Sequence, residues 1–223
     1  MSSDVLGPGP RTRVRRLSKK ASYDAALIYA IFDEAPFGHV AAVVDGRAGV
    51  LPTLFAREGD TIYLHASQSN AVLRAVLECG EACVTATLYD GVRLARSGFE
   101  SSIAYRSAVA YGSAREVTEG TRKAEILDSF VDSVVPGRSA EVRAMTDLER
   151  RLTLVVAVDV EEASAKVSAG PTDDDELDQA MAIWSGTVPA RLVFGRPEPY
   201  SDGAMASGQL EVPASVRALL GDE

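Results

Sequence analysis

Residues 61–75 (TIYLHASQSNAVLRA) change from an alternating strand pattern to a helix pattern, with polar side chains at the junction. A helix N-terminus presents backbone N–H groups without intrahelical partners and the positive end of the helix dipole, so it can bind phosphate. Ser67, Ser69 and Asn70 can each add a hydrogen bond, and His65 can add charge when protonated. The segment therefore predicts an anion site, with the alternative that Ser69 only caps the helix.

Two arginines, the single tryptophan and one proline are the other candidates for chemistry. Arg96 and Arg106 lie in strand patterns whose other positions are apolar, and a buried arginine needs a partner. That partner is either a carboxylate of the protein or a ligand phosphate, which suits the forked guanidinium. Trp184 is either a core anchor or a wall that stacks on a planar ligand. Pro52 cannot donate to a sheet, so it indicates an edge strand, a bulge or a strand lining a ligand.

The composition is that of a single globular domain: the chain has 223 residues, of which 46% are apolar. The net charge of −9 argues against a nucleic-acid partner, which favours basic proteins. The basic segment 11–20 is the exception. It is either a solvated arm or a segment that pairs with the acidic residues 173–178 of the same or a partner subunit.

No apolar run approaches the roughly 20 residues that a membrane-spanning helix needs, and no secretory signal is recognisable. The expected location is therefore the cytoplasm, with no membrane partner. Cys79 and Cys83 have neither redox-motif nor zinc-site spacing, so both are expected to pack as small hydrophobes, with no metal site.

The elements follow one another at the short spacing of an antiparallel barrel or sandwich, with about seven or eight strands and three or four helices. Asp45-Gly46 and Asp90-Gly91 each predict a hairpin turn. Ser22 is the expected N-cap of the first helix, and Gly80 the C-cap of the second. The expected helices cover residues 22–35, 69–80, 120–137 and 212–220, and the expected strands cover 37–46, 47–60, 61–66, 81–91, 92–99, 105–117, 151–167 and 187–195.

Six segments in a fixed order carry a resemblance that extends over residues 11–196. They are RTRVRR, GHVAAVVDGRAGVLPTLFAREGDTIYLHAS, CVTATLYDGVRLARSGF, YRSAVAYG, EEASAKV and IWSGTVP. Together they resemble the flavin-nucleotide-binding branch of the pyridoxamine 5'-phosphate oxidase-like superfamily, which includes the nitroimidazole-resistance reductases.

The resemblance implies a mainly β fold with flanking helices: an FMN-binding split β-barrel, six-stranded and antiparallel in Greek-key order, built as a homodimer with FMN at the interface. The expected division is a basic arm at residues 1–20, the split-barrel domain at 21–197 and a flexible tail at 198–223.

The resemblance also implies which residues hold the flavin. Residues 50–53 would line the flavin ring, residues 65–67 would lie near the ribityl chain or ring, and residues 69–71 at the helix start would meet the phosphate. Residues 106–107 of the long strand would approach the flavin from the barrel side. Trp184 would lie at the ring edge, from either subunit, and Arg74 would supply charge to the phosphate loop. The set is Val50, Leu51, Pro52, Thr53, His65, Ala66, Ser67, Ser69, Asn70, Ala71, Arg74, Arg106, Ser107 and Trp184.

The chain departs from the family's usual pattern at the site. Asn70-Ala71 stands where relatives often carry a basic residue. FESSIAYRS stands where many relatives read FHHSMNYRS, so Glu100 and Ser101 replace two histidines and Ala104 replaces an asparagine. Loss of one charge-assisted hydrogen bond to a phosphate costs about 1.5–3 kcal/mol.

Two functions follow from these observations. The first is a cytoplasmic FMN-dependent oxidoreductase that acts on a small molecule, with a nicotinamide as a candidate reductant. His65 would then be the catalytic polar group, unless it only bonds a backbone carbonyl. The alternative is a non-catalytic dimeric split-barrel binding module with a weakened flavin site, or one that binds haem or a deazaflavin.

Overall fold

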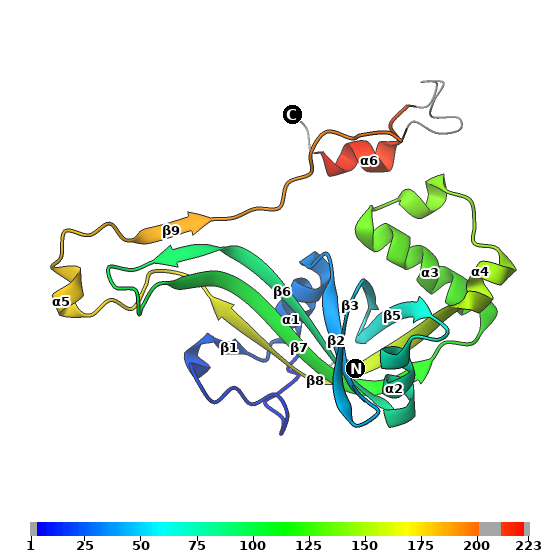
Figure 1. Ribbon diagram of the computed structural model, residues 1–223, viewed down its shortest axis with the longest axis horizontal. Helices are drawn as coiled ribbons and strands as arrows, with labels where there is room; N and C mark the ends of the chain where they lie inside the picture. The colour runs from blue at the N-terminus through cyan, green and yellow to red at the C-terminus, as the bar shows by residue number, and fades with distance from the viewer. Residues whose placement is uncertain (1–3, 201–210, 221–223) are drawn as a thin grey trace.

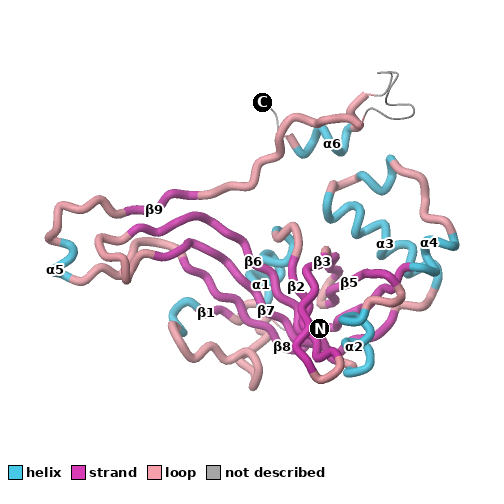
Figure 2. The backbone as a smooth tube through the Cα atoms, viewed as in Figure 1, coloured by secondary structure: helices cyan, strands magenta, loops and turns pink. Residues whose placement is uncertain are grey.

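The computed structural model describes residues 4–200 and 211–220, which form one curved antiparallel sheet with helices packed around it (Figures 1 and 2). The strands are β1 (Ala21–Ser22), β2 (Gly38–Val44), β3 (Arg47–Thr53), β4 (Phe55–Glu58), β5 (Thr61–Ser67), β6 (Glu81–Leu94), β7 (Ser102–Glu116), β8 (Thr153–Ser168) and β9 (Gly186–Pro189). The helices are η1 (Ser18–Lys20), α1 (Ala25–Glu34), α2 (Ala71–Cys79), α3 (Gly120–Val134), η2 (Arg138–Glu141), α4 (Asp147–Leu152), α5 (Glu176–Gln179) and α6 (Ala214–Leu219).

The mainly β fold with flanking helices is confirmed, but the expected count of six strands is wrong for the described residues. Nine strands pair along the path β3-β2-β6-β7-β8-β5-β4, with β1 added to β8 and β9 added to β6. No ladder in this part of the chain joins β3 to β4, so the hydrogen-bonded path is not closed. The two end strands are nevertheless consecutive in the chain, with only Leu54 between them. The sequence did not reveal this interruption.

Two apolar clusters hold the fold together. The larger one packs α1 and α2 against one face of the sheet. The periodicity of α1 predicts one stripe of Leu27, Ile28, Ile31 and Phe32; the last three are buried and Leu27 is half-buried. The smaller one packs Leu127 and Phe130 of α3 against β4, β5 and β8. The amphipathic pattern of this helix predicts Leu127, Phe130, Val131 and Val134 inward, and Leu127 and Phe130 are buried as expected.

The prediction for the end of α3 was less accurate. Val131 is half-buried, and Val134 is exposed. Val134 is the last residue of α3, where the helix stops covering the sheet.

Local turn and cap signals were only partly correct. The Asp45-Gly46 hairpin is confirmed, because both residues have positive φ, 50° and 73°, as a tight two-residue turn requires. The first helix is capped by Asp24, whose carboxylate accepts from the N–H of Ala26, while Ser22 lies in β1. Gly80 ends α2 with φ +75°, as expected.

Asp90-Gly91 does not form a hairpin. Residues 81–94 are one continuous strand, β6, and its ladder with β7 shifts register between Tyr89 and Gly91. A Cβ on Gly91 would lie 2.3 Å from the carbonyl oxygen of Val188 in β9. This glycine therefore permits a close approach of β9, and it does so inside a bulge.

An arm of the sheet extends away from the body, where β6 and β7 run together with β9 alongside and α5 at the tip (Figure 1). Beyond β9, residues 190–199 have no regular structure, so the strand expected at 187–195 is wrong over most of its length. The short C-terminal helix is confirmed as α6, where Ser215 bonds Glu141 of η2. The expectation of flexibility for the tail falls partly on residues 201–210 and 221–223, outside the described residues.

The basic N-terminal segment packs on the same chain. Lys19 pairs with Asp173 at 3.2 Å, which is the basic-to-acidic pairing considered above. Arg11 pairs with Glu81 at 2.5 Å and with Glu162 at 3.2 Å. Because these are partly exposed ion pairs, each contributes only modestly to stability.

Three further observations bear on the class of protein. No helix of the described residues is long and apolar enough to span a membrane. The same residues contain no group of three or more His, Cys, Asp or Glu side chains that could together hold a metal ion. Cys83 is half-buried, but Cys79 is exposed at the end of α2, so the expectation that both cysteines pack inside is wrong for Cys79.

Candidate functional site

The loop between β5 and α2 has the geometry of an anion site. Ser67 and Ser69 are exposed and their hydroxyl oxygens lie 3.4 Å apart. Asn70 is the N-cap, since its side chain accepts from the N–H of Leu73 at 3.0 Å, so the expected cap at Ser69 is corrected by one residue. Within the described chain, the N–H groups of Ala71 and Val72 make no hydrogen bond. Two hydroxyls and two N–H groups therefore remain for a ligand.

Arg74 stabilises this loop through hydrogen bonds to Gln68. Its Nε donates to the carbonyl oxygen of Gln68 at 2.8 Å, and its guanidinium also meets the Gln68 side chain. A further nitrogen lies 3.4 Å from the carboxylate of Glu116. The charge of Arg74 is therefore already paired, so the loop itself offers hydrogen-bond donors without a free cation.

His65 lies on β5 and points to the smaller apolar cluster. Its ring centroid is 4.2 Å from that of Phe130, and its Nδ1 is buried without a hydrogen-bond partner among the described residues. The backbone-carbonyl bond considered as an alternative is not present there for this nitrogen. Burial lowers the pKa of His65. The neutral imidazole is therefore the favoured form, and its Nδ1 has no partner among the residues that the structure describes.

This lowered pKa predicts a pH dependence of stability. In the unfolded chain His65 takes up a proton near its ordinary pKa of about 6.5, whereas the folded protein resists protonation until lower pH. The free energy of unfolding should therefore fall as pH drops below about 6.5, by no more than about 1.4 kcal/mol per pH unit for one proton. Urea unfolding of cofactor-free protein should show this loss, and His65→Gln should reduce it. Equal pH profiles would contradict the assignment.

The strand predicted to line the flavin ring presents its residues alternately to two faces. Val50 and Pro52 are exposed on the outer face, and Leu51 and Thr53 are half-buried on the other. Pro52 lies in β3, at one end of the sheet path, as its missing N–H predicted. Ala66, next to His65, packs against the larger core.

Arg106 and Ser107 lie far along the sheet from the loop. His65 pairs with Val155 of β8, and Arg106 pairs with Val167 of the same strand. Residues 155 to 167 correspond to roughly 40 Å of strand. Arg106 and the loop at α2 therefore do not meet within one chain.

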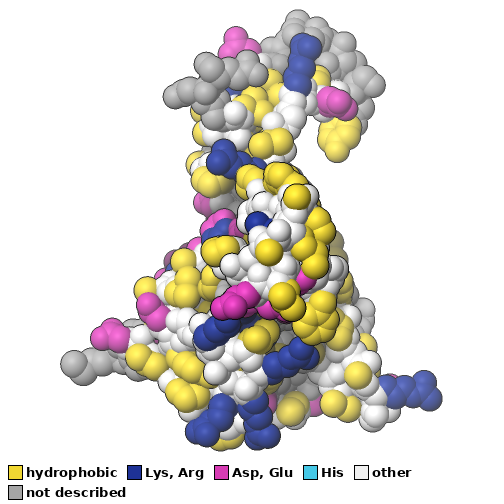
Figure 3. Space-filling model, turned by 90° about the vertical axis from the view of Figure 1, so that its left-hand side faces the viewer, with side chains coloured by type: hydrophobic (Ala, Val, Ile, Leu, Met, Phe, Trp, Pro, Cys, Tyr) yellow, Lys and Arg dark blue, Asp and Glu magenta, His cyan; other side chains and the backbone are white. Residues whose placement is uncertain are grey.

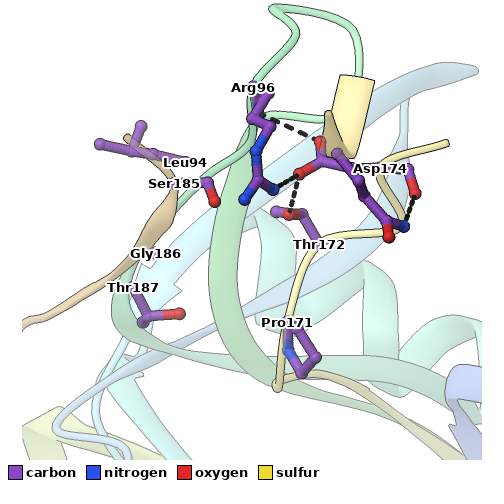
Figure 4. Close-up of a pocket in the computed structure, with 9 residues that line it drawn as sticks. Leu94, Arg96, Pro171, Thr172, Asp174, Ser185, Gly186 and Thr187 are labelled. Atoms are coloured by element: carbon purple, nitrogen blue, oxygen red, sulfur yellow. Dashed lines mark hydrogen bonds and ion pairs between the residues drawn. The ribbon is translucent and has the colours of Figure 1, made fainter. Parts of the chain in front are cut away.

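Both strand arginines are paired with carboxylates, which was one of the two partners considered. Arg106 meets Glu34 and, at 2.8 Å, Asp90, and these bonds raise the pKa of its guanidinium. Arg96 pairs with Asp174 at 2.9 Å in a cavity of about 530 Å³ at the arm, where the two residues face each other beside Thr172 (Figure 4).

Trp184 is 66% exposed, so it is not a core anchor of this chain. Its indole lies over Gly186, where an added Cβ would be 3.1 Å from the ring. The remaining alternative, a wall for a planar ligand, stays open. In the chain Trp184 stands between α5 and β9, and these two elements lie on the arm, away from α2 (Figure 1).

His39 stands inside an apolar strand pattern, which predicts a core position, but the structure shows a different environment. It is half-buried, with its ring centroid 6.2 Å from that of Phe37, and it pairs with Pro52 across the β2–β3 hairpin. The period-two alternation from the fully buried Val40 is the signal that could have placed His39 on the outer face.

An exposed apolar patch, not identified in the sequence, covers the same face. It consists of Ala41, Val43, Ala48 and Val50, which are cross-strand neighbours in β2 and β3. Val43 is 71% exposed and Val50 62%. We refer to these four residues as the outer patch.

The curved antiparallel sheet with helices packed on it is the fold of the pyridoxamine 5'-phosphate oxidase-like proteins. The family model for pyridoxamine 5'-phosphate oxidase matches residues 24–167. The chain belongs to the pyridoxamine 5'-phosphate oxidase family.

Solved structures show the same fold. The flavocytochrome Anf3 from Azotobacter vinelandii is 34% identical, with a TM-score of 0.87, over 96% of this chain and 98% of its own. The FAD and haem binding protein from Mycobacterium smegmatis is 37% identical, with a TM-score of 0.84, over 91% and 98%. A protein assigned to 5-nitroimidazole antibiotic resistance in Bacteroides thetaiotaomicron shares the fold at 23% identity and a TM-score of 0.57, over 66% and 86%. No curated protein matches.

Proposed function

We propose that this chain is a homodimeric flavoprotein oxidoreductase that binds a flavin and a haem, as a flavocytochrome does. The observation that carries the proposal is the similarity to two solved proteins over more than 90% of both chains, one a flavocytochrome and the other an FAD and haem binding protein. Residues of this chain supply hydrogen-bond donors suited to a flavin phosphate and an imidazole nitrogen suited to a haem iron.

The α2 loop would hold the phosphate part of the flavin. Its donors are the hydroxyls of Ser67 and Ser69 and the N–H groups of Ala71 and Val72. A terminal phosphate monoester, as in FMN, is close to a dianion at neutral pH, whereas each phosphate of a pyrophosphate diester carries one charge. Because Arg74 is already paired with Glu116, the loop suits the singly charged groups of FAD better than the FMN suggested by the resemblance.

His65 fits a haem iron ligand. It is one of only two histidines in the chain, and its buried Nδ1 has no partner in the described residues. A nitrogen of neutral imidazole is a common metal ligand, and burial here favours the neutral form. The adjoining cluster around Phe130 and the half-buried Met145 is apolar, as suits a porphyrin.

When bound, the flavin would supply hydride or electron transfer and the haem one-electron transfer. The residues of this chain would bind and orient these groups. The donors of the α2 loop would bind the flavin phosphates. The side chains of Val50 and Pro52, on the outer face of β3, would pack against the flavin ring and exclude water from it. A small molecule is the expected substrate, with a nicotinamide as the candidate reductant.

The proposed dimer explains two features of the single chain. The outer patch is exposed although it is apolar, and apolar patches of this kind mark interaction surfaces. Ser107 pairs with Lys166, far along β8 from the residues that pair with β5, and Trp184 stands just before β9, whose arm extends away from α2 (Figure 1). A second copy seated on the outer patch would bring residues from its own arm toward the flavin.

The test is the absorption spectrum of the protein as purified. We expect flavin absorption together with a Soret band, and FAD in the supernatant after denaturation. A spectrum with flavin alone would remove the haem from the proposal, and release of FMN would contradict the argument from Arg74. Colourless protein that takes up neither flavin would instead support the non-catalytic binding module.

A further inference from the structure

A second cavity, of about 590 Å³, lies beside the N-terminal segment, away from the α2 loop. Four of its lining residues are cationic: Lys19, Lys20, Arg93 and Arg106. Seen from the tip of the arm, Lys and Arg side chains gather on the lower part of the molecule (Figure 3). This concentration is unexpected in a chain with a net charge of −9.

Two of these cations share one hydroxyl group. Arg93 donates from a terminal nitrogen to the Oγ of Ser168 at 3.0 Å, and Lys20 donates to the same oxygen at 3.1 Å. Arg93 is only 5% exposed and Ser168 only 1%. Two positive groups are therefore held together at the wall of a cavity, one of them almost fully buried.

Neither cation has a carboxylate partner in the described chain. The remaining bonds of Arg93 go to the backbone carbonyls of Gly170, at 2.9 Å, and Pro171. By contrast, Arg106 is paired with Glu34 and Asp90, and Lys19 with Asp173. Burying a charge without a counter-charge is costly, so this arrangement favours an anion in the cavity.

A purely structural role explains Arg93 but not Lys20. The guanidinium of Arg93 ties the turn after β8 through three acceptors, which is sufficient to hold that turn. Lys20 adds a second positive charge next to it, at a cost in repulsion, and the one carboxylate among the lining residues, Asp173, is paired with Lys19. An anion bound between the two would remove that repulsion.

The other walls define the rest of the ligand. Leu27, Val167, Ala169 and Pro171 line the cavity with apolar groups. We propose that this cavity binds a small organic anion, with its phosphate or carboxylate group on Lys20 and Arg93 and an apolar body against the remaining walls. Within one chain this site is separate from the α2 loop, and it shares only Arg106 with the residues that the resemblance assigns to the flavin.

The test is isothermal titration calorimetry at low salt on the full, cofactor-loaded protein, with phenyl phosphate and benzoate as probes. We expect one site per chain, and the tighter probe identifies the headgroup class. Lys20→Gln should weaken binding about tenfold or more, because it removes a charge-assisted contact, and Lys20→Arg should retain it. Lys20 is half-buried at the protein surface, so neither variant should affect folding.

Arg47→Gln is the matched control, because Arg47 is an exposed cation on the distant β2–β3 turn with no carboxylate partner in the described chain. It should leave binding unchanged. Equal affinity in Lys20→Gln, no binding of either probe at millimolar concentration, or equal weakening by Arg47→Gln would each overturn the proposal. Binding that occurs only after removal of the flavin would place the anion in the flavin site and would also overturn it.

Discussion

Replacing His65 by alanine is expected to remove the haem while leaving the flavin in place. The proposed iron ligand disappears, whereas the donors at Ser67, Ser69 and the start of α2 are unchanged. Metal affinity depends on the count of its ligands, so haem content should fall from about one per chain to less than about a tenth. The measurement is the ratio of Soret to flavin absorption in the purified variant.

His39→Ala is the matched control for this variant. His39 is the other histidine of the chain, and it lies on the outer face of β2, away from Phe130. Its removal should leave the Soret band intact. Free imidazole added to the His65→Ala protein should restore haem binding in part, because the small-molecule ligand can enter the space left by the side chain. A full Soret band in His65→Ala would rule out His65 as the ligand.

Val50→Glu is expected to convert the protein to a monomer and to release the flavin. Val50 is the centre of the outer patch and is opposite Ala41, so a carboxylate there would be buried against a second subunit without a partner. Such burial costs several kcal/mol, which corresponds to a roughly thousandfold or greater loss of association. Sedimentation velocity at micromolar concentration should show the monomer, and gel filtration should separate the protein from its flavin.

Leu148→Glu separates the loss of the interface from the addition of a charge. Leu148 is an exposed apolar residue on α4, outside the outer patch, so its replacement should leave both assembly and flavin content unchanged. Thermal unfolding of both variants would confirm that each is folded. A wild-type protein that is monomeric and still holds flavin would contradict the proposed dimer.

The local parts of the fold could be predicted from the sequence, and the parts that depend on distant residues could not. Asp45-Gly46 forms its hairpin because the turn is decided by the two residues themselves. Asp90-Gly91 has the same pattern, but β9 arrives from residues 186–189 and packs on Gly91, which turns the pair into a bulge. No local pattern carries that information.

The candidate site divides in the same way. The loop at α2 was predicted because its serines, its asparagine and the helix start are neighbours in the chain. The pairing of Arg74 with Glu116, and of Arg106 with Glu34, joins residues 42 and 72 positions apart. An arginine in an apolar strand predicts that a partner is needed. The acid that serves as this partner depends on how the sheet packs, which the local sequence does not show.

Strand β3 has one further consequence, for the behaviour of the protein at high concentration. A two-residue turn makes Val44 and Arg47 a hydrogen-bonded pair, so pairs alternate along the hairpin and His39 and Pro52 form a non-hydrogen-bonded one. The nitrogen of Pro52 therefore faces the free edge of the sheet, where it has no hydrogen to offer. An incoming strand would find its ladder interrupted there, so the proline protects the exposed margin beside Val50 from fibril-like stacking of many chains.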